Sequence, residues 1–455
     1  MRGFRSTLIL LVIFLGLLAY IYFYESKRPA GGAPETKAKV FTVESDKIAE
    51  LSVKAASGER SELKKSGGKW TLVKPEPTGV DESELSSITS SLANLEIQRV
   101  LEDNPTDLKQ YGLAEARLEV GYKTESGDAK RLLIGDKTAT GGDLYAKLPD
   151  ERRVFLISGF LDGTFNKTPF NLRDKSILKF EREKVDALEI DAADPNGSHM
   201  RFGKKAGEDW TMARPVAARA DVPAVEGVIG RLQSAQMKSI AASEAAKPSE
   251  YGLDKPALTV TIGAASARHQ LTIGKEAPES AVYAREASRP MVFTVDKSIV
   301  DDIKKPVVDF RDKDLFKFRS FNAERLELTR AKDTWVFEKS KGAGGEEKWK
   351  QVAPAPKDVD TAKMDTLLMK LSNLRAKSFP DAKVKTGLDS PVLTVKARFD
   401  GKEERVMFGR SGDNVYASRG GDPGAAQIEA SDFTDSNKAL DDLNAAPAPE
   451  TPKKP

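Results

Sequence analysis

Residues 70–113, WTLVKPEPTGVDESELSSITSSLANLEIQRVLEDNPTDLKQYGL, contain the first copy of a pattern that occurs three times in this chain. Its fixed points are Trp70, Pro75, Asp81 and the pair Gly112-Leu113. The pattern returns with Trp210, Pro215, Asp221, Gly252 and Leu253, and again with Trp349, Pro354, Asp360, Gly387 and Leu388. The tryptophans lie 140 and 139 residues apart in a chain of 455 residues, which is about three domains long at roughly 150 residues per domain. The sequence therefore predicts three copies of one domain.

Each copy contains the elements of a sheet and one amphipathic helix. Apolar and polar residues alternate before each tryptophan, as in Ile48–Val53, which is typical of a strand with one buried face. The proline after each tryptophan cannot donate to a sheet ladder, so it marks the end of that strand. Apolar residues then recur at helical spacing. They are Leu85, Ile88, Leu92 and Leu95 in the first copy, Val225, Val228, Leu232 and Ala235 in the second, and Met364, Leu367, Leu371 and Leu374 in the third.

The repeated aspartates are the most regular acidic positions of the sequence. Asp81 directly precedes the first helical run, with Glu84 in the place of a capping-box partner, and Asp221 and Asp360 stand at the same point of the other copies. An acid/base pair would need two carboxylates close together, whereas these three lie in separate copies. The pattern favours helix capping over catalysis.

Further strand pairs close on Gly135, Gly274 and Gly409. The period of the repeat is far longer than the roughly 20 to 50 residues of a solenoid repeat. The predicted fold class is α+β, with three tandem repeats of an antiparallel-sheet-plus-helix domain after one N-terminal transmembrane helix. The predicted domains are 40–179, 180–317 and 318–443, followed by a disordered tail at 444–455 that is rich in Ala, Pro and Lys.

The N-terminal segment has the features of a membrane anchor. Residues 6–24 carry no charge and, at about 1.5 Å per helical residue, would span roughly 28 Å of hydrocarbon. We expect residues 1–24 to form a cytoplasmic tip and an uncleaved transmembrane anchor, residues 25–39 to form a flexible tether, and the body to be translocated. The alternative is a cleaved signal peptide with a weak cleavage site near Ala30–Ala33.

Composition argues against several classes of function. Lys and Arg number 72 against 69 Asp and Glu, with both signs interspersed, so the chain lacks the basic stripe of a nucleic-acid-binding protein. There is no cysteine, and His199 and His269 are the only histidines, which leaves little material for a catalytic triad or a metal site. We therefore expect no catalytic, cofactor-binding or metal-binding residues, and no enzymatic activity.

The aromatic residues leave two interpretations open. The three repeated tryptophans could stack on sugars or anchor the cores, and their recurrence in step with the apolar helical face favours the cores. A later hairpin in each copy carries Tyr145, Tyr283 or Tyr416, and these tyrosines are candidates for an exposed aromatic binding surface.

The N-terminal span, the Trp-x4-Pro motif, the Asp-led helix, the Tyr-Gly-Leu signature and the strand pair ending at glycine together resemble a bacterial family known as domain of unknown function 4340. The resemblance covers residues 40–443, and the third copy departs from it because Thr386 replaces the tyrosine. It implies a protein anchored in the bacterial inner membrane by residues 6–24, with its N-terminus cytoplasmic and its body periplasmic. It also implies association with the membrane subunits of gliding-motility-type ABC transporters.

The expected function is that of a non-enzymatic, periplasmic accessory or scaffold subunit that works with an ABC-type transporter in the cell envelope. The alternative is an envelope module that binds glycan or peptidoglycan through the tyrosines. The sequence does not predict an oligomeric state.

Overall fold

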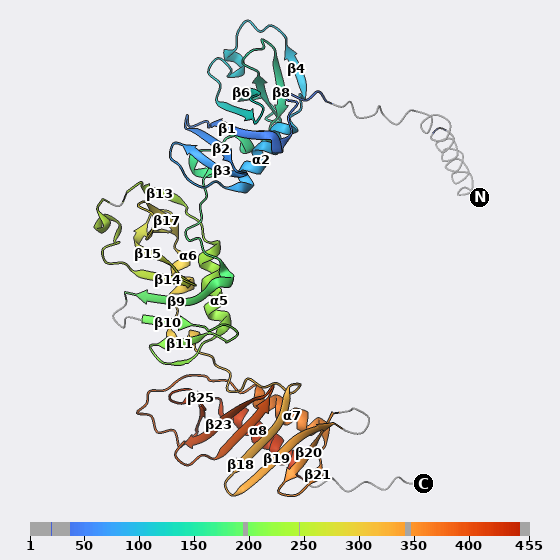
Figure 1. The fold of residues 1–455 in the computed structure, drawn as a ribbon, viewed down its shortest axis with the longest axis vertical. Helices are drawn as coiled ribbons and strands as arrows, with labels where there is room; N and C mark the ends of the chain where they lie inside the picture. Colours follow the sequence, from blue (N-terminus) through green and yellow to red (C-terminus); the bar gives the residue numbers. More distant parts are fainter. Residues whose placement is uncertain (1–19, 21–36, 194–198, 245, 342–346, 446–455) are drawn as a thin grey trace, which may run out of the picture. The chain divides into compact units, whose positions relative to one another are not determined.

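The computed structural model describes residue 20 and residues 37–193, 199–244, 246–341 and 347–445 (Figure 1). The chain divides into two compact units, Met1–Lys175 and Ser176–Pro455. The anchor predicted at residues 6–24 lies outside the described residues except for Tyr20, as does the tether predicted at 25–39 up to residue 36. Within the part of the chain that is described, no helix is both long and apolar enough to cross a bilayer.

The first unit is built on one antiparallel sheet of eight strands in the order β3-β2-β1-β5-β6-β7-β8-β4. The strands are β1 (Ile48–Lys54), β2 (Arg60–Ser66), β3 (Lys69–Lys74), β4 (Arg99–Glu102), β5 (Leu118–Thr124), β6 (Ala129–Lys137), β7 (Asp143–Lys147) and β8 (Val154–Ser158). Strands β3 and β4 lie at opposite edges, so the chain between them crosses one face of the sheet. Helix α2 (Glu82–Ala93) makes this crossing.

The core of the first unit lies between α2 and the sheet. Leu85, Ile88 and Leu92 on α2 pack in one cluster with apolar residues of the strands, including Leu51 and Val53 of β1. Because strand side chains alternate, Glu50 and Ser52 of β1 face the opposite side of the sheet, away from the core. The remaining helical segments are α3 (Leu161–Phe165), α4 (Pro169–Leu172), η2 (Ser45–Lys47) and η3 (Lys109–Tyr111).

The second unit contains two further antiparallel sheets. The first of them has nine strands in the order β12-β11-β10-β9-β14-β15-β16-β17-β13. They are β9 (Val185–Ala192), β10 (His199–Gly203), β11 (Thr211–Arg214), β12 (Ala218–Arg219), β13 (Ser239–Ala242), β14 (Leu258–Ala264), β15 (Ala267–Ala277), β16 (Ala281–Glu286) and β17 (Val292–Asp296). The helical segments are α5 (Val222–Ser234), α6 (Ser298–Ile303), η4 (Arg182–Lys184), η5 (Pro248–Tyr251) and η6 (Val307–Phe310).

The last sheet has eight strands in the order β21-β20-β19-β18-β22-β23-β24-β25. They are β18 (Ala323–Arg330), β19 (Asp333–Lys341), β20 (Glu347–Ala353), β21 (Lys357–Asp358), β22 (Leu393–Phe399), β23 (Lys402–Ser411), β24 (Asn414–Arg419) and β25 (Ala426–Ile428). Two helices, α7 (Thr361–Ser372) and α8 (Ala430–Asn444), accompany it. They are tied together by a hydrogen bond from Lys363 Nζ to the Asp442 carbonyl, 2.9 Å, and an ion pair between Lys370 and Asp435, 2.7 Å.

The described chain is thus mostly antiparallel sheet with few helices, arranged as three sheets. The predicted apolar helical faces are buried in all three copies, so the periodicity located these helices correctly. The prediction missed α8, whose buried side chains include Phe433 and Leu440. This helix ends at Asn444, and the tail predicted at 444–455 lies outside the described residues from residue 446 onward.

The segment before the last sheet belongs with that sheet. Leu315 and Phe316 precede the predicted limit at 317/318, yet both pack in the core cluster that contains α7, α8 and the strands of the last sheet. Ile177 and Leu178 are buried in the same way before β9. Each sheet of the second unit therefore takes several core residues from the segment that enters it.

Candidate functional site

The repeated tryptophans are core residues. Trp70, Trp210 and Trp349 are 9%, 2% and 5% exposed, respectively. The Trp210 indole Nε1 donates to Glu226 Oε1 on α5 at 2.8 Å. Because so little of each ring is exposed, the tryptophans act as core anchors rather than as the sugar-stacking platform that was the other interpretation of the sequence.

The repeated aspartates cap three separate helices. The Asp81 carboxylate accepts hydrogen bonds from the Ser83 and Glu84 N–H groups, both at 3.2 Å. Asp221 accepts from Ala224 N–H at 2.9 Å, and Asp360 from Lys363 N–H at 3.1 Å. The arrangement brings no two of these three carboxylates together at one helix end.

Asp81 is also held by a lysine. Its Oδ2 lies 2.9 Å from Lys175 Nζ. Burial by itself would raise the pKa of Asp81, but the Lys175 ammonium and the two capping N–H groups outweigh it and hold the pKa below its ordinary value. Glu84, which the sequence placed in a capping box, instead pairs with Lys167 at 2.7 Å.

The prolines and the Gly-Leu pairs shape turns. Cis peptide bonds precede Pro75, Pro215 and Pro354. The glycines of the Gly-Leu pairs, Gly112, Gly252 and Gly387, have φ of 66°, 69° and 70°, which glycine adopts without a steric penalty. Leu113 is buried, and Leu253 and Leu388 are half-buried.

A second set of glycines packs against these turns. A Cβ atom on Gly135 or Gly274 would lie 2.0 Å from the carbonyl oxygen of Tyr111 or Tyr251, and one on Gly409 would lie 2.5 Å from that of Thr386. The glycine that closes each strand pair is therefore needed where the Gly-Leu turn lies on the sheet. The two glycine signatures of the sequence are two sides of one contact.

The candidate binding tyrosines are less exposed than predicted. Tyr416 is only 5% exposed, so the expectation of an exposed ring is wrong there. Tyr145 and Tyr283 are half-buried, with ring centroids 5.0 and 5.1 Å from those of Tyr111 and Tyr251. Ring pairs of this kind are favourable contacts in their own right, so the two tyrosine signatures of the sequence stabilise each other.

The histidines do not form a site. His199 Nδ1 lies 2.6 Å from Asp191 Oδ1 on the exposed side of β10. His269 is on β15, three strands away from β10 in the sheet order, beside the ring of Phe180. Over residues 37–193, 199–244, 246–341 and 347–445, no group of three or more His, Asp or Glu residues is placed to hold a metal ion.

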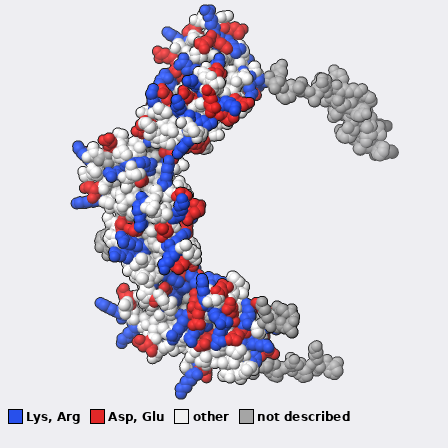
Figure 2. Space-filling view, viewed as in Figure 1, with Lys and Arg blue, Asp and Glu red and all other residues white. Residues whose placement is uncertain are grey.

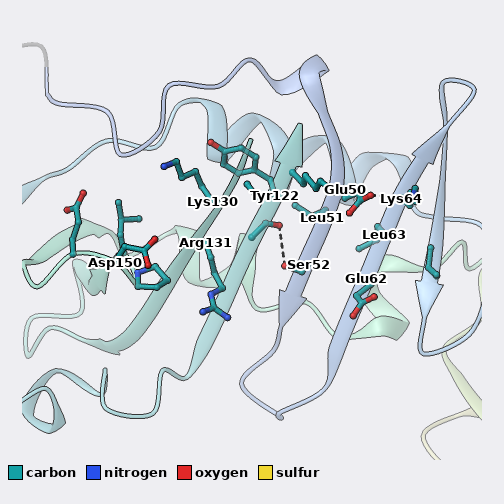
Figure 3. Close-up of a pocket in the computed structure, with 17 residues that line it drawn as sticks. Glu50, Leu51, Ser52, Glu62, Leu63, Lys64, Tyr122, Lys130, Arg131 and Asp150 are labelled. Atoms are coloured by element: carbon teal, nitrogen blue, oxygen red, sulfur yellow. Dashed lines mark hydrogen bonds and ion pairs between the residues drawn. The ribbon is translucent and has the colours of Figure 1, made fainter. Parts of the chain in front are cut away.

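A hollow of about 680 Å³ lies on the first sheet (Figure 3). Its floor is the face of β2, β1, β5 and β6 opposite the core, and residues 148–151 between β7 and β8 also line it. The polar and charged lining residues include Glu50, Ser52, Glu62, Lys64, Lys123, Arg131, Asp150 and Glu151, and the apolar ones include Val73, Leu148 and Pro149. We call this feature the sheet-face hollow.

The charges of the sheet-face hollow are arranged around small residues. Figure 3 shows Arg131 and Glu62 on the same side of the strands, with Ser52 between them and Asp150 beyond Arg131. Ser52 Oγ donates to the Gly121 carbonyl at 3.4 Å. The nearest partner of Arg131 is Glu119 at 3.8 Å, and Glu62 pairs with the exposed Lys74 at 3.0 Å. Both end side chains remain about half exposed, Arg131 at 54% and Glu62 at 52%.

A different charged cluster lies inside the second unit. Arg219, at the end of β12, places Nε 3.4 Å from Asp312 and 3.8 Å from Asp422, and Nη1 3.5 Å from Glu404. Arg419 forms ion pairs with Asp312 and Asp422. Burial raises the pKa of Glu404, although the N–H groups of Lys317 and Phe318 and the Arg219 guanidinium oppose it. The cluster links strands of both sheets of this unit.

Two arginines bind the carbonyl groups of the segments that enter the sheets. Arg289 donates to the carbonyls of Ser176 and Ile177. Arg419 donates to those of Asp312 and Asp314, at 3.0 and 2.5 Å. The acidic partner stands three residues before Arg289, as Glu286, but three residues after Arg419, as Asp422. Both sheets therefore use an arginine with an acidic partner to bind the preceding segment, but the arginine and the acidic residue have exchanged places in the sequence.

Sequence reasoning missed both the sheet-face hollow and the charged cluster. The hollow depends on which residues face one another across four strands, which the sequence alone does not give. A signal was nevertheless present. Small residues, Ser52 and Gly121, stand where the third copy has Glu327 and Lys396 when the strands are aligned by their repeat positions.

The fold and the described side chains define a class of protein built from consecutive antiparallel sheets, each with a capped helix and a buried tryptophan. The chain matches the family described as Domain of unknown function (DUF4340) over residues 36–101, 70–209 and 210–391. These matches span more than half of the chain, and the chain belongs to this family. No curated protein matches it.

Proposed function

We propose that this chain is a non-enzymatic scaffold of the bacterial envelope, anchored in the inner membrane by residues 6–24, with its body in the periplasm. In this proposal it is an accessory subunit that works with the membrane subunits of an ABC-type transporter. The observation that supports the proposal is that the repeated residues have structural roles. The tryptophans build cores, the aspartates cap helices and the glycines pack turns, so the repeat encodes a shape rather than a reactive centre.

The charge distribution supports a protein partner rather than a nucleic acid. Figure 2 shows basic and acidic side chains interspersed over the face in view. Nucleic-acid binding depends on a basic surface that neutralises phosphates, and mixed charges do not provide one. Mixed charges do provide orientation-specific contacts with another protein.

The second unit has the internal ties expected of a scaffold. Arg219 contacts Asp312 and Glu404, and thereby connects β12 with the segment that enters the last sheet and with β23. Ion pairs that are partly buried depend strongly on geometry, because a displaced partner leaves an unpaired charge. Such ties favour a fixed arrangement of the two sheets within this unit.

In-membrane cross-linking tests the transporter partnership. A photo-reactive amino acid at Phe160 or Phe321, which are 73% and 79% exposed, would sample two open surfaces of the intact chain. We expect at least one position to cross-link to the membrane subunit of an ABC transporter. A probe at the buried Phe155 is the matched control and should give no product. If neither exposed probe captures a transporter subunit while the anchor is intact, the partnership is wrong.

Membrane topology can be tested separately. A reporter that is active only in the periplasm, fused after the C-terminus, should be active when residues 6–24 are present. Activity of a cytoplasm-only reporter at the same position would overturn the orientation.

The alternative, an envelope module that binds glycan or peptidoglycan through tyrosines, has less support. Tyr416 is buried, and Tyr145 and Tyr283 each pack against a second tyrosine. Sedimentation of the chain with purified cell wall, abolished by Tyr145→Ala together with Tyr283→Ala, would revive this function.

A further inference from the structure

One row of facing residues distinguishes the first sheet from the other two. In the first sheet the row is Glu62, Ser52, Gly121 and Arg131, on β2, β1, β5 and β6. The two inner residues are small, and a Cβ atom on Gly121 would lie only 2.7 Å from Ser52 Oγ. The middle of this row is therefore almost bare, while its ends carry opposite charges.

The corresponding rows of the other sheets are filled. In the last sheet the inner residues are Glu327 and Lys396, which face each other and form an ion pair of 2.8 Å. In the nine-stranded sheet Glu189 pairs with Arg201 at 3.3 Å. Long side chains thus cover the strands there and satisfy one another. The sheet-face hollow exists because its row lacks such a pair.

The wall of the hollow differs as well. In the other two sheets an arginine a few residues after the tyrosine, Arg289 or Arg419, donates hydrogen bonds to backbone carbonyls of the segment that precedes the sheet. The first sheet has Leu148 and Glu151 at the positions of Glu286 and Arg289, and both line the hollow. Two independent differences from the other copies therefore meet at one place.

The end charges define a ligand that carries both signs. Glu62 and Arg131 are three strand spacings apart, which is about 14 Å between their Cα atoms. Both side chains are long enough to lean toward the middle of the row, which would bring their charged groups closer together than their Cα atoms. Three extended residues span about 10 Å, so a tripeptide with an ammonium group at one end and a carboxylate at the other fits between them.

We propose that the sheet-face hollow binds a short peptide with free termini, which lies across the strands with its ammonium group at Glu62 and its carboxylate at Arg131. Arginine suits this task because its planar guanidinium donates two parallel hydrogen bonds to a carboxylate. Val73, Leu148 and Pro149 offer apolar contacts to small side chains of the peptide. The strands below are fully paired with their neighbours, so recognition is by side chains rather than by strand addition.

Calorimetric titration of the full-length chain with four alanine tripeptides tests the proposal. The probes are trialanine, N-acetyl-trialanine, trialanine amide and the doubly blocked N-acetyl-trialanine amide. We expect trialanine to bind and the removal of either terminal charge to weaken binding at least about tenfold, because each end loses one or more charged hydrogen bonds. Binding that is equally tight with both termini blocked would overturn the assignment.

Two variants assign the ends of the peptide. Arg131→Gln should abolish the preference for trialanine over trialanine amide and keep the preference over N-acetyl-trialanine. Glu62→Gln should do the reverse. Comparing each variant with each modified peptide separates the two contacts from any general loss of structure. If either variant weakens all four peptides alike, the proposed orientation is wrong.

A third variant fills the hollow. Ser52→Glu with Gly121→Lys introduces the pair found at the same register in the last sheet, and should abolish binding of trialanine. Ser86→Glu with Ser90→Lys, at exposed positions of α2 four residues apart, adds the same charges on the other side of the sheet and should bind as the parent does. Normal binding by the filled variant would refute the proposed site.

Discussion

Replacing Gly274 by alanine should loosen the segment between Pro248 and Ala277. The new Cβ atom would stand 2.0 Å from the Tyr251 carbonyl oxygen, 3.0 Å from its carbonyl carbon and 3.1 Å from the Gly252 carbonyl carbon. Because Cβ atoms in proteins do not approach other atoms so closely, η5 and β15 must separate by about 1 Å. Overpacking of this kind costs about 1 to 3 kcal/mol, which increases local opening roughly 5- to 150-fold.

Hydrogen exchange measured by mass spectrometry is a suitable assay, because it reports opening segment by segment in a chain with several sheets. Gly227→Ala is the matched control. Gly227 is an exposed residue within α5, and a Cβ atom there would meet nothing within 4 Å. Alanine in a helix is favoured over glycine by about 0.5 to 1 kcal/mol, so this variant should increase protection of α5. If Gly274→Ala exchanges as slowly as the parent across 248–277, the proposed steric role is wrong.

Other predictions concern single side chains. Trp349→Ala should destabilise the last sheet by about 3 to 5 kcal/mol in hydrogen exchange, and the half-buried Trp335→Ala by less. Burial alone would raise the pKa of Asp81, but Lys175 lowers it below the ordinary value. The Asp81 carboxylate therefore stabilises the first unit above about pH 3.9, and this stabilisation is lost as pH falls through the lowered pKa. Asp81→Asn should reduce this loss of stability in acid, as measured by thermal melts. Burial raises the pKa of Glu404, so the stability of the second unit should decline as pH rises from about 4.3 through the raised pKa. Glu404→Gln should remove this decline. If the decline is unchanged in the variant, Glu404 is not its cause.

The elements with strong local periodicity could be predicted from the sequence. Leu85, Ile88 and Leu92 mark α2 because a helix presents such positions on one face, and Asp81 marks its start because a carboxylate can bind the first free N–H groups. Repetition made these inferences more secure, since each was made in three copies.

The features that depend on distant partners could not be predicted. Ser52 and Gly121 are 69 residues apart, and only the pairing of β1 with β5 places them side by side under the hollow. Tyr416 shares its sequence position with two half-buried tyrosines, yet it is buried in a copy that lacks their tyrosine partner. Helix α8 was missed because it has no equivalent of similar length in the other copies.

The carbonyl contacts of Arg289 and Arg419 have a practical consequence for dissecting the chain. Each arginine holds backbone groups that precede its own sheet, and Leu315 and Phe316 are buried in the core of the last sheet. The smallest fragment that retains all of these contacts for the last sheet begins before Asp312, not at residue 318. A truncation at the predicted limit would cut through a core, whereas one that keeps the entering segment retains the core residues Leu315 and Phe316.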